Sequence, residues 1–357
     1  MKPAIWLAGA LLPALAPISP SSAEPSNGRL EERPVLLRTY PEQVYFTTAN
    51  AKEKLSASIV MLIVEEPVGR SSTPQALELI HKAGARVVRT DRILPPVLET
   101  VEIASFPPAR LHSREAAKHV NWSHTYRLFV VTPAVAGRDS IEARLSLQQA
   151  GAPKVVSATI PVRAYQSKTS LIFPFTGPGI ISQGGALSSG HRNRSGLYAL
   201  DALGLSETYG PMRRPEPDDD PKNYAGWGRE IISPAGGTIV RVRNDRPDQP
   251  VAGKSDPAYF VPEFPDGGDP GNHVVIDHGN GEFSMIAHMQ KGSVRVKAGD
   301  RVTQGQILGL LGNSGDTSGP HVHYQLQSGP DWERSDGLPA RFTNVSTTER
   351  GSYFTAR

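Results

Sequence analysis

The chain has 357 residues, a formal net charge of +3 and no cysteine. Its length is that of about two domains of ordinary size. The absence of cysteine excludes disulfide bonds and removes thiolates from the candidate metal ligands and nucleophiles. The 34 glycines and 32 prolines favour turns and short strands over long helices. We therefore expect an all-β protein whose stability rests on its packed cores.

The first 23 residues have the pattern of a secretory signal peptide. Lys2 supplies a positive charge, Ala4–Ala16 is a short apolar stretch, and Ser21–Ala23 offers small residues before a cleavage point. The apolar stretch is shorter than the roughly 20 residues that a membrane span needs, and later apolar runs have the length of strands. We expect export to the periplasm or the extracellular space, with no stable membrane span after the signal is removed.

Residues 24–165 predict a β-rich, sandwich-like accessory domain. Ser58–Val64 and Arg127–Val131 are apolar runs of strand length. The alternating segments 143–147 and 155–162 flank a Gly-Ala-Pro turn, which is the pattern of a hairpin.

One helix is expected to interrupt these strands. Thr73 is a suitable N-cap, Pro74 suits the first helical position and Gly84 is a suitable stop. The apolar face of this helix would be formed by Ala76, Leu77 and Ile80.

The second half of the chain predicts another unit of short strands. We expect a linker at 166–178, a second domain at 179–345 and a tail at 346–357. The domain is dense in glycine, and Gly279–Gly281 predicts a tight hairpin turn between two of its strands.

Histidines and one aspartate in this second unit form a candidate metal site. His321 and His323 are two residues apart, so a strand would place both on one face. His288 ends another predicted strand beside a turn. Asp201 follows an apolar stretch in which an unpaired carboxylate would be costly, and His191 lies upstream of it. Zinc accepts nitrogen and oxygen ligands, and a catalytic site has three protein ligands and a water molecule.

The segment 271–327 closely resembles the catalytic core of the lysostaphin-type (LytM-like) zinc endopeptidases. The resemblance covers GNHVVIDHGNGEFSMIAH, the GSV turn, the run GDRVTQGQILG and the final GPHVHYQLQ, in this order. Weaker similarity reaches back to about residue 180 through 228–242, so that roughly half of the chain is covered. A His-x-His pair alone would be far less specific.

The resemblance implies a role for each candidate residue. His323 matches a zinc ligand, Asp201 the zinc-binding aspartate and His191 the first zinc ligand. His321 and His288 match the two catalytic histidines, and the sequence leaves open which of them is the general base. The family resemblance also implies an antiparallel sheet with a groove that holds Zn²⁺.

One departure concerns the spacing of the first two ligands. Many members of the family separate this histidine and aspartate by three residues, which would place the histidine at Leu197. Nine residues lie between His191 and Asp201 here, as in members with a longer loop.

The implied function is hydrolysis of peptide cross-links in bacterial peptidoglycan by a zinc metalloendopeptidase. Peptidoglycan peptides are the expected partner, and no nucleic acid is expected. Three alternatives stay open. One is a non-catalytic lysostaphin-like domain that binds and activates other wall hydrolases. Another is a peptidase that acts on proteins in general, since zinc chemistry does not determine the substrate class. The third is a lipoyl- or biotin-carrier barrel, suggested by the segment 296–308, but such a barrel has no use for the histidines and the aspartate.

Overall fold

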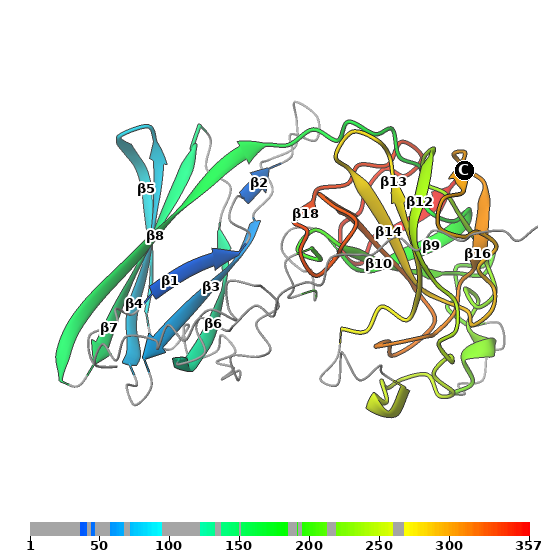
Figure 1. Ribbon diagram of the computed structural model, residues 1–357, viewed down its shortest axis with the longest axis horizontal. Coiled ribbons are helices and arrows are strands. Elements are labelled where there is room, and N and C mark those ends of the chain that lie inside the picture. Colours follow the sequence, from blue (N-terminus) through cyan, green and yellow to red (C-terminus); the bar gives the residue numbers. More distant parts are fainter. Residues whose placement is uncertain are drawn as a thin grey trace, which may run out of the picture.

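The computed structural model describes eleven segments of the chain: 36–40, 44–46, 58–67, 72–94, 122–132, 137–149, 151–184, 191, 195–212, 219–259 and 268–357. The expected signal peptide at 1–23 lies outside them. In the described segments the regular structure is β-strand, with short 3-10 helices at Pro221–Asn223 and Pro257–Tyr259 (Figure 1). The expected all-β class is therefore confirmed. No helix in the described part of the chain is long and apolar enough to cross a membrane.

Strands β1–β8 form two sheets, which Figure 1 draws in blue to green. One sheet has the order β1-β3-β6 and the other β2-β8-β7-β4-β5. The bounds are β1 Leu36–Tyr40, β2 Val44–Phe46, β3 Ser58–Pro67, β4 Ser72–Ala83, β5 Arg86–Ile93, β6 Trp122–Thr132, β7 Ser140–Gln149 and β8 Ala152–Ala164.

The predicted hairpin is present as β7 and β8. Gly151 turns the chain with a φ of 81°, and Leu145 pairs with Val156 in the antiparallel ladder. Every second residue of β7 is buried, which is the burial pattern of a strand with one face on a core.

The expected helix after Thr73 is wrong, because these residues form strand β4. This strand pairs with β7 on one side and β5 on the other, so both ladders satisfy its backbone. Leu77 and Leu79 are buried against β7 and β8. Tertiary pairing thus overrides a local helix start, and a bulge after Pro74 accommodates its missing N–H. Gly84 has a φ of 58° in the turn to β5 and does not end a helix.

The second half of the chain forms a nine-stranded antiparallel sheet. Eight strands have the order β15-β12-β13-β14-β17-β10-β9-β19, and β18 pairs with β17. A short ladder of β11 and β16 lies apart from it. The bounds are β9 Gly177–Gln183, β10 Leu200–Gly204, β11 Glu230–Ile232, β12 Gly237–Arg243, β13 Asn272–Asp277, β14 Phe283–Met289, β15 Arg301–Val302, β16 Ile307–Leu310, β17 Val322–Gln327, β18 Gly337–Leu338 and β19 Tyr353–Ala356.

The main core lies on one face of this sheet. Phe173 and Phe175 are fully buried in it, and their rings meet edge to face at a centroid distance of 5.0 Å. Phe354 of β19 packs against both rings. Parts of the expected linker and tail thus contribute to the core, and the expected domain boundaries stay predictions. The expected turn at Gly279–Gly281 is confirmed between β13 and β14, with a positive φ at both glycines.

The pleat of the sheet selects which side chains face away from this core. The residues on either side of Asp201 in β10 are buried in the core, and so are those on either side of His323 in β17. Because side chains alternate along a strand, Asp201 and His323 lie on the opposite face. The two residues are cross-strand partners, and Ala287 of β14 pairs with His323 on its other side. A central position on this second face is therefore polar.

Candidate metal centre

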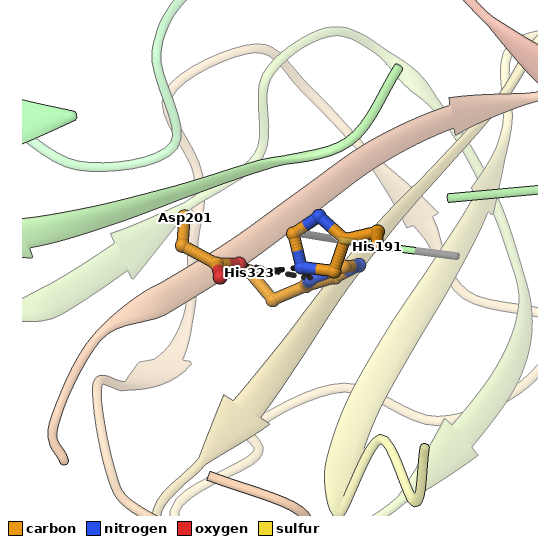
Figure 2. Close-up of side chains that lie close together, drawn as sticks. All are labelled: His191, Asp201 and His323. Carbon is orange, nitrogen blue, oxygen red and sulfur yellow. Dashed lines mark hydrogen bonds and ion pairs between the residues drawn. The ribbon is translucent and has the colours of Figure 1, made fainter. Parts of the chain in front are cut away.

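Three side chains on this polar face point toward one another, as Figure 2 shows. His191 comes from the loop before β10, Asp201 from β10 and His323 from β17. The three residues form a cluster that can hold a metal ion. Asp201 and His323 are each 8% exposed, so the cluster is largely removed from water.

The spacing of the three donor atoms suits a small ion with tetrahedral coordination. His323 Nδ1 lies 3.1 Å from His191 Nε2 and 3.0 Å from Asp201 Oδ1. His191 Nε2 lies 3.2 Å from Asp201 Oδ2. Bonds of about 2.0–2.1 Å to zinc place neighbouring tetrahedral ligands roughly 3.3 Å apart. The donor set of two imidazoles and one carboxylate therefore fits zinc in type and in spacing.

Asp201 supplies the negative charge of the cluster. Its burial alone would raise its pKa, but the neighbouring His321 and His191 hold the pKa of Asp201 well below its ordinary value. The carboxylate is thus ionised at neutral pH, in the form that binds a cation.

His323 is held by a second hydrogen bond away from the cluster. Its Nε2 lies 3.0 Å from Oε1 of Gln325, which leaves Nδ1 facing Asp201 and His191. Burial, and then the proximity of His191, lower the pKa of His323. A neutral imidazole is the form that binds metal.

His321 lies at the entrance to β17, beside the cluster. Its Nδ1 is 2.8 Å from the carbonyl oxygen of Gly319, to which it donates, and its Nε2 is 3.5 Å from Asp201 Oδ1. Burial opposes protonation, but the Asp201 carboxylate prevails and raises the pKa of His321. A hydrogen on Nε2 can therefore be donated toward the cluster.

His288 approaches the same place from the end of β14. Its ring centroid lies 4.7 Å from that of His321 and 5.8 Å from that of His323. The backbone of His288 has a φ of 60°, which is uncommon for a residue other than glycine and is typical of functional sites. Nδ1 lies 2.8 Å from the carbonyl oxygen of Ser314. Burial, followed by the charges of His321 and His323, holds the pKa of His288 well below its ordinary value.

The structure brings together all five residues singled out from the sequence. Asp201 lies inside β10, and the apolar residues Leu197 and Tyr198 before it form a turn, although an apolar stretch of this kind suggests a buried strand. Gln325 was not among the residues expected from the sequence; its signal is its position two residues after His323, on the same face of β17.

A cavity of about 680 Å³ lies on the same face of the sheet. It is lined by residues that include Arg241, Arg243, His273 and Trp332. Val275, Met285 and Ala287 form an apolar strip between it and His323, and Trp332 packs on this strip. Pro270, in the cavity wall, accepts a hydrogen bond from the backbone N–H of His288 at 3.1 Å. The cavity therefore lies beside the end of β14 that carries His288, although none of the five residues of the candidate site lines it.

Comparison with known proteins identifies a domain that contains part of this cluster. Residues 223–334 match the model of Peptidase family M23. These residues form a family M23 peptidase domain. The match contains His288, His321 and His323, whereas His191 and Asp201 lie before it.

Several proteins that are named as peptidases match segments of this chain that are shorter than the family match. The chain is 48% identical over 56 residues to the peptidoglycan DD-endopeptidase ShyA of Vibrio cholerae, covering 16% of this chain and 13% of that protein. It is 32% identical over 99 residues to an uncharacterized metalloprotease of Haemophilus influenzae, covering 28% and 16%. It is 38% identical over 57 residues to the DD-carboxypeptidase/endopeptidase Mpg of Neisseria meningitidis, covering 16% and 13%. The chain thus matches only a small part of each relative.

Two solved structures complete the comparison. The catalytic domain of the antimicrobial peptidase lysostaphin from Staphylococcus simulans aligns at a TM-score of 0.26 and 17% identity, covering 45% of this chain and 88% of that chain. A zinc-containing peptidase from Vibrio cholerae aligns at a TM-score of 0.28 and 12% identity, covering 82% and 84%.

Proposed function

We propose that the protein is a zinc-dependent endopeptidase that hydrolyses peptide cross-links in bacterial peptidoglycan. The observation that carries the proposal is the meeting of His191, Asp201 and His323, with donor atoms 3.0–3.2 Å apart, next to two further histidines. The family M23 domain and the names of the relatives favour this reaction over other metal-dependent hydrolyses.

In this proposal His191, Asp201 and His323 hold the zinc ion. A bound zinc ion supplies Lewis-acid polarisation of a peptide carbonyl and of a water molecule. Buried, ionised Asp201 and the neutral imidazole of His323 suit this task, because neither must lose a proton when the ion binds at neutral pH.

The two remaining histidines have different roles in this proposal: one accepts a proton from water, and the other donates a hydrogen bond to the scissile carbonyl. Since Nδ1 of His288 donates to the carbonyl of Ser314, its Nε2 has a lone pair that accepts a proton from the attacking water. His321, whose Nδ1 donates to Gly319, directs a second donor on Nε2 to the oxygen of the scissile carbonyl as that oxygen becomes negative.

The polar face provides room for a peptide beside these residues. We place one arm of the substrate in the cavity near Trp332, since the apolar strip of Val275, Met285 and Ala287 leads there from His323. We also propose that the chain is exported, to the periplasm or the extracellular space, where peptidoglycan is found. The pattern of residues 1–23 supports export.

The test combines metal analysis with cleavage of purified peptidoglycan. We expect about one zinc ion per wild-type chain, with release of cross-linked peptides. His191→Ala and His323→Ala should lose both the zinc and the activity. His278→Ala, outside the cluster, is the control and should keep both. A wild type without zinc and without cleavage overturns the proposal, and zinc retained in His191→Ala overturns that ligand.

A further inference from the structure

A row of side-chain amides leads away from His323 along β17. Gln325 and Gln327 follow at intervals of two residues, on the same face of the strand. Oε1 of Gln325 lies 3.0 Å from Nε2 of His323, and Nε2 of Gln325 donates to Oε1 of Gln327. Nε2 of Gln327 donates to the carbonyl oxygen of Gly329 at 2.7 Å. The row is buried, with Gln325 3% and Gln327 0% exposed.

The direction of this row is fixed at its far end. The carbonyl of Gly329 can only accept a hydrogen bond, so the amide of Gln327 must point its nitrogen there and its oxygen toward Gln325. That oxygen in turn requires the nitrogen of Gln325, whose oxygen is left to face His323. Only Nε2–H of His323 can then complete the row.

A second contact prevents Gln325 from turning over. Its Nε2 also donates to Oγ of Ser195 at 3.0 Å, and Ser195 is 1% exposed. Both hydrogens of the amide are therefore used. A flipped Gln325 would lose its donation to Gln327 and place its nitrogen against Nε2 of His323, in a buried site where lost hydrogen bonds are costly.

We propose that Gln325 and Gln327 are positioning residues that hold the proton of His323 on Nε2 and so keep the lone pair of Nδ1 for the metal. The inference rests on the proposed metal centre. An opposing influence makes the amide row necessary: Asp201 Oδ1 lies 3.0 Å from Nδ1 and attracts a proton to that atom. A proton on Nδ1 would occupy the position that the metal takes.

The first readout is the protonation pattern of His323 in metal-free protein at pH 8, by nitrogen NMR of histidine-labelled chains. In the wild type, Nε2 carries the proton. In Gln325→Met, which keeps the length of the side chain but loses both the donor and the acceptor, the proton moves to Nδ1. In Gln325→Glu the acceptor is kept, so the proton stays on Nε2.

The second readout is zinc affinity, measured by competition with a chelator. Gln325→Met should weaken zinc binding roughly 10–100-fold, as is usual for loss of the partner of a ligating histidine. Gln325→Glu keeps the acceptor toward His323 but loses the donor to Gln327, and it should weaken zinc binding by less than Gln325→Met does. Gln327→Met, which does not touch His323, should weaken it by a smaller factor of several-fold. Gln304→Met, a surface glutamine on the same domain, is the control and should leave the affinity unchanged.

A wild type with the proton on Nδ1, or a Gln325→Met variant with unchanged protonation and zinc affinity, overturns the inference. If Gln325→Met does not fold, Gln327→Met carries the same two readouts. The NMR readout needs neither zinc nor substrate. A wild type with the expected proton on Nε2 but without peptide cleavage would therefore reject the peptidase and leave the role of the amide row supported.

Discussion

The carbonyl oxygen of Ser314 accepts a hydrogen bond from Nδ1 of His288 at 2.8 Å, and it fixes which nitrogen of this histidine carries the proton. Ser314 is itself held on both sides: its Oγ donates to the carbonyl of Met289 at 2.7 Å and accepts from the N–H of Asn272 at 2.9 Å. The loop before β17 is thus tied to the ends of β13 and β14 directly behind His288.

Gly271 makes this close approach possible. Its φ is 61°, and a Cβ added there would lie 2.2 Å from the carbonyl oxygen of Ser314. Gly271→Ala should therefore displace Ser314, destabilise the protein and lower kcat. Gly279→Ala is the matched control, because Gly279 also has a positive φ, of 81°, but open space around its Cβ.

Urea unfolding and peptide hydrolysis measure both effects. The control should lose about 1–2 kcal/mol of unfolding free energy from backbone strain alone and keep its kcat. Gly271→Ala should lose about 1–3 kcal/mol more, as overpacking does, together with activity. Equal losses in the two variants would show that the contact with Ser314 is unimportant.

The two histidines outside the ligand set should be separable from the ligands by metal content. We expect His288→Ala and His321→Ala to keep about one zinc ion and to lose roughly 10²–10⁴-fold in kcat, the usual contribution of a general acid or base. His323→Ala should lose the metal as well. Loss of zinc from either His288→Ala or His321→Ala would assign that histidine to the ligand set.

The site was easier to predict from the sequence than the arrangement of strands that supports it. The spacing of His321 and His323 indicates a shared face, and His288, Asp201 and His191 are candidates from their positions in the sequence. The family resemblance implies the role of each. Gln325 has the same spacing, but a lone glutamine has no chemical signature, and its role depends on the carbonyl of Gly329.

The wrong expectation of a helix, and the burial of two phenylalanines that the sequence does not reveal, have physical causes. Thr73 and Pro74 form a valid local helix start, but β4 is paired on both sides and this long-range pairing cannot be seen in the sequence. Phe173 and Phe175 lie in a segment that reads as a linker because of its prolines and polar residues. Their burial depends on contact with Phe354, far away in the chain.

His273 should make the stability of the protein depend on pH. Burial, with smaller contributions from Arg241 and Arg243, lowers its pKa from 6.5 to about 4. Between pH 6.5 and pH 4 the unfolded chain binds a proton at His273 that the folded protein does not bind. The contribution of His273 to the free energy of unfolding therefore falls as the pH drops below 6.5, and it is constant above that pH. The loss at pH 4.5 is about 2–3 kcal/mol, at 1.36 kcal/mol per pKa unit.

Chemical denaturation at pH 7 and at pH 4.5 tests this dependence. The difference in unfolding free energy between the two pH values should be smaller in His273→Gln than in the wild type, by about that 2–3 kcal/mol. Comparing differences within each variant removes the cost of the substitution itself. An identical pH dependence in the two proteins would mean that His273 is protonated equally in the folded and unfolded states.

Glu282 should anchor the segment that enters the sheet domain. It is fully buried and accepts hydrogen bonds from the backbone N–H groups of Lys168 and Thr169, both at 2.8 Å, and from the hydroxyl of Tyr165. Burial alone would raise its pKa, but hydrogen bonds, from Thr169 first, hold the pKa of Glu282 below its ordinary value.

Glu282→Gln replaces one acceptor oxygen by a donor that faces backbone N–H. We expect a loss of about 1–3 kcal/mol in unfolding free energy at pH 7, the cost of buried donors left without partners. Glu349→Gln, at an exposed position, is the control and should change the stability by no more than about 0.5 kcal/mol. A Glu282→Gln variant as stable as the control would reject the anchor.

Trp332 offers a test of where the substrate lies. It lines the cavity and packs on the apolar strip that leads from His323, so Trp332→Ala removes an apolar surface from the proposed peptide site without touching the metal ligands. KM for a cross-linked peptide should rise by roughly 10-fold or more, since burial of a large side chain contributes about 1.5–3 kcal/mol, while zinc content is unchanged and kcat changes little.

Tyr353→Ala is the matched control: this aromatic residue is 60% exposed on β19, at the other edge of the sheet, and its loss should leave KM unchanged. Equal KM values for Trp332→Ala and the wild type would place the substrate elsewhere on the face, and a fall in kcat alone would mean that Trp332 supports the histidines and does not contact the peptide.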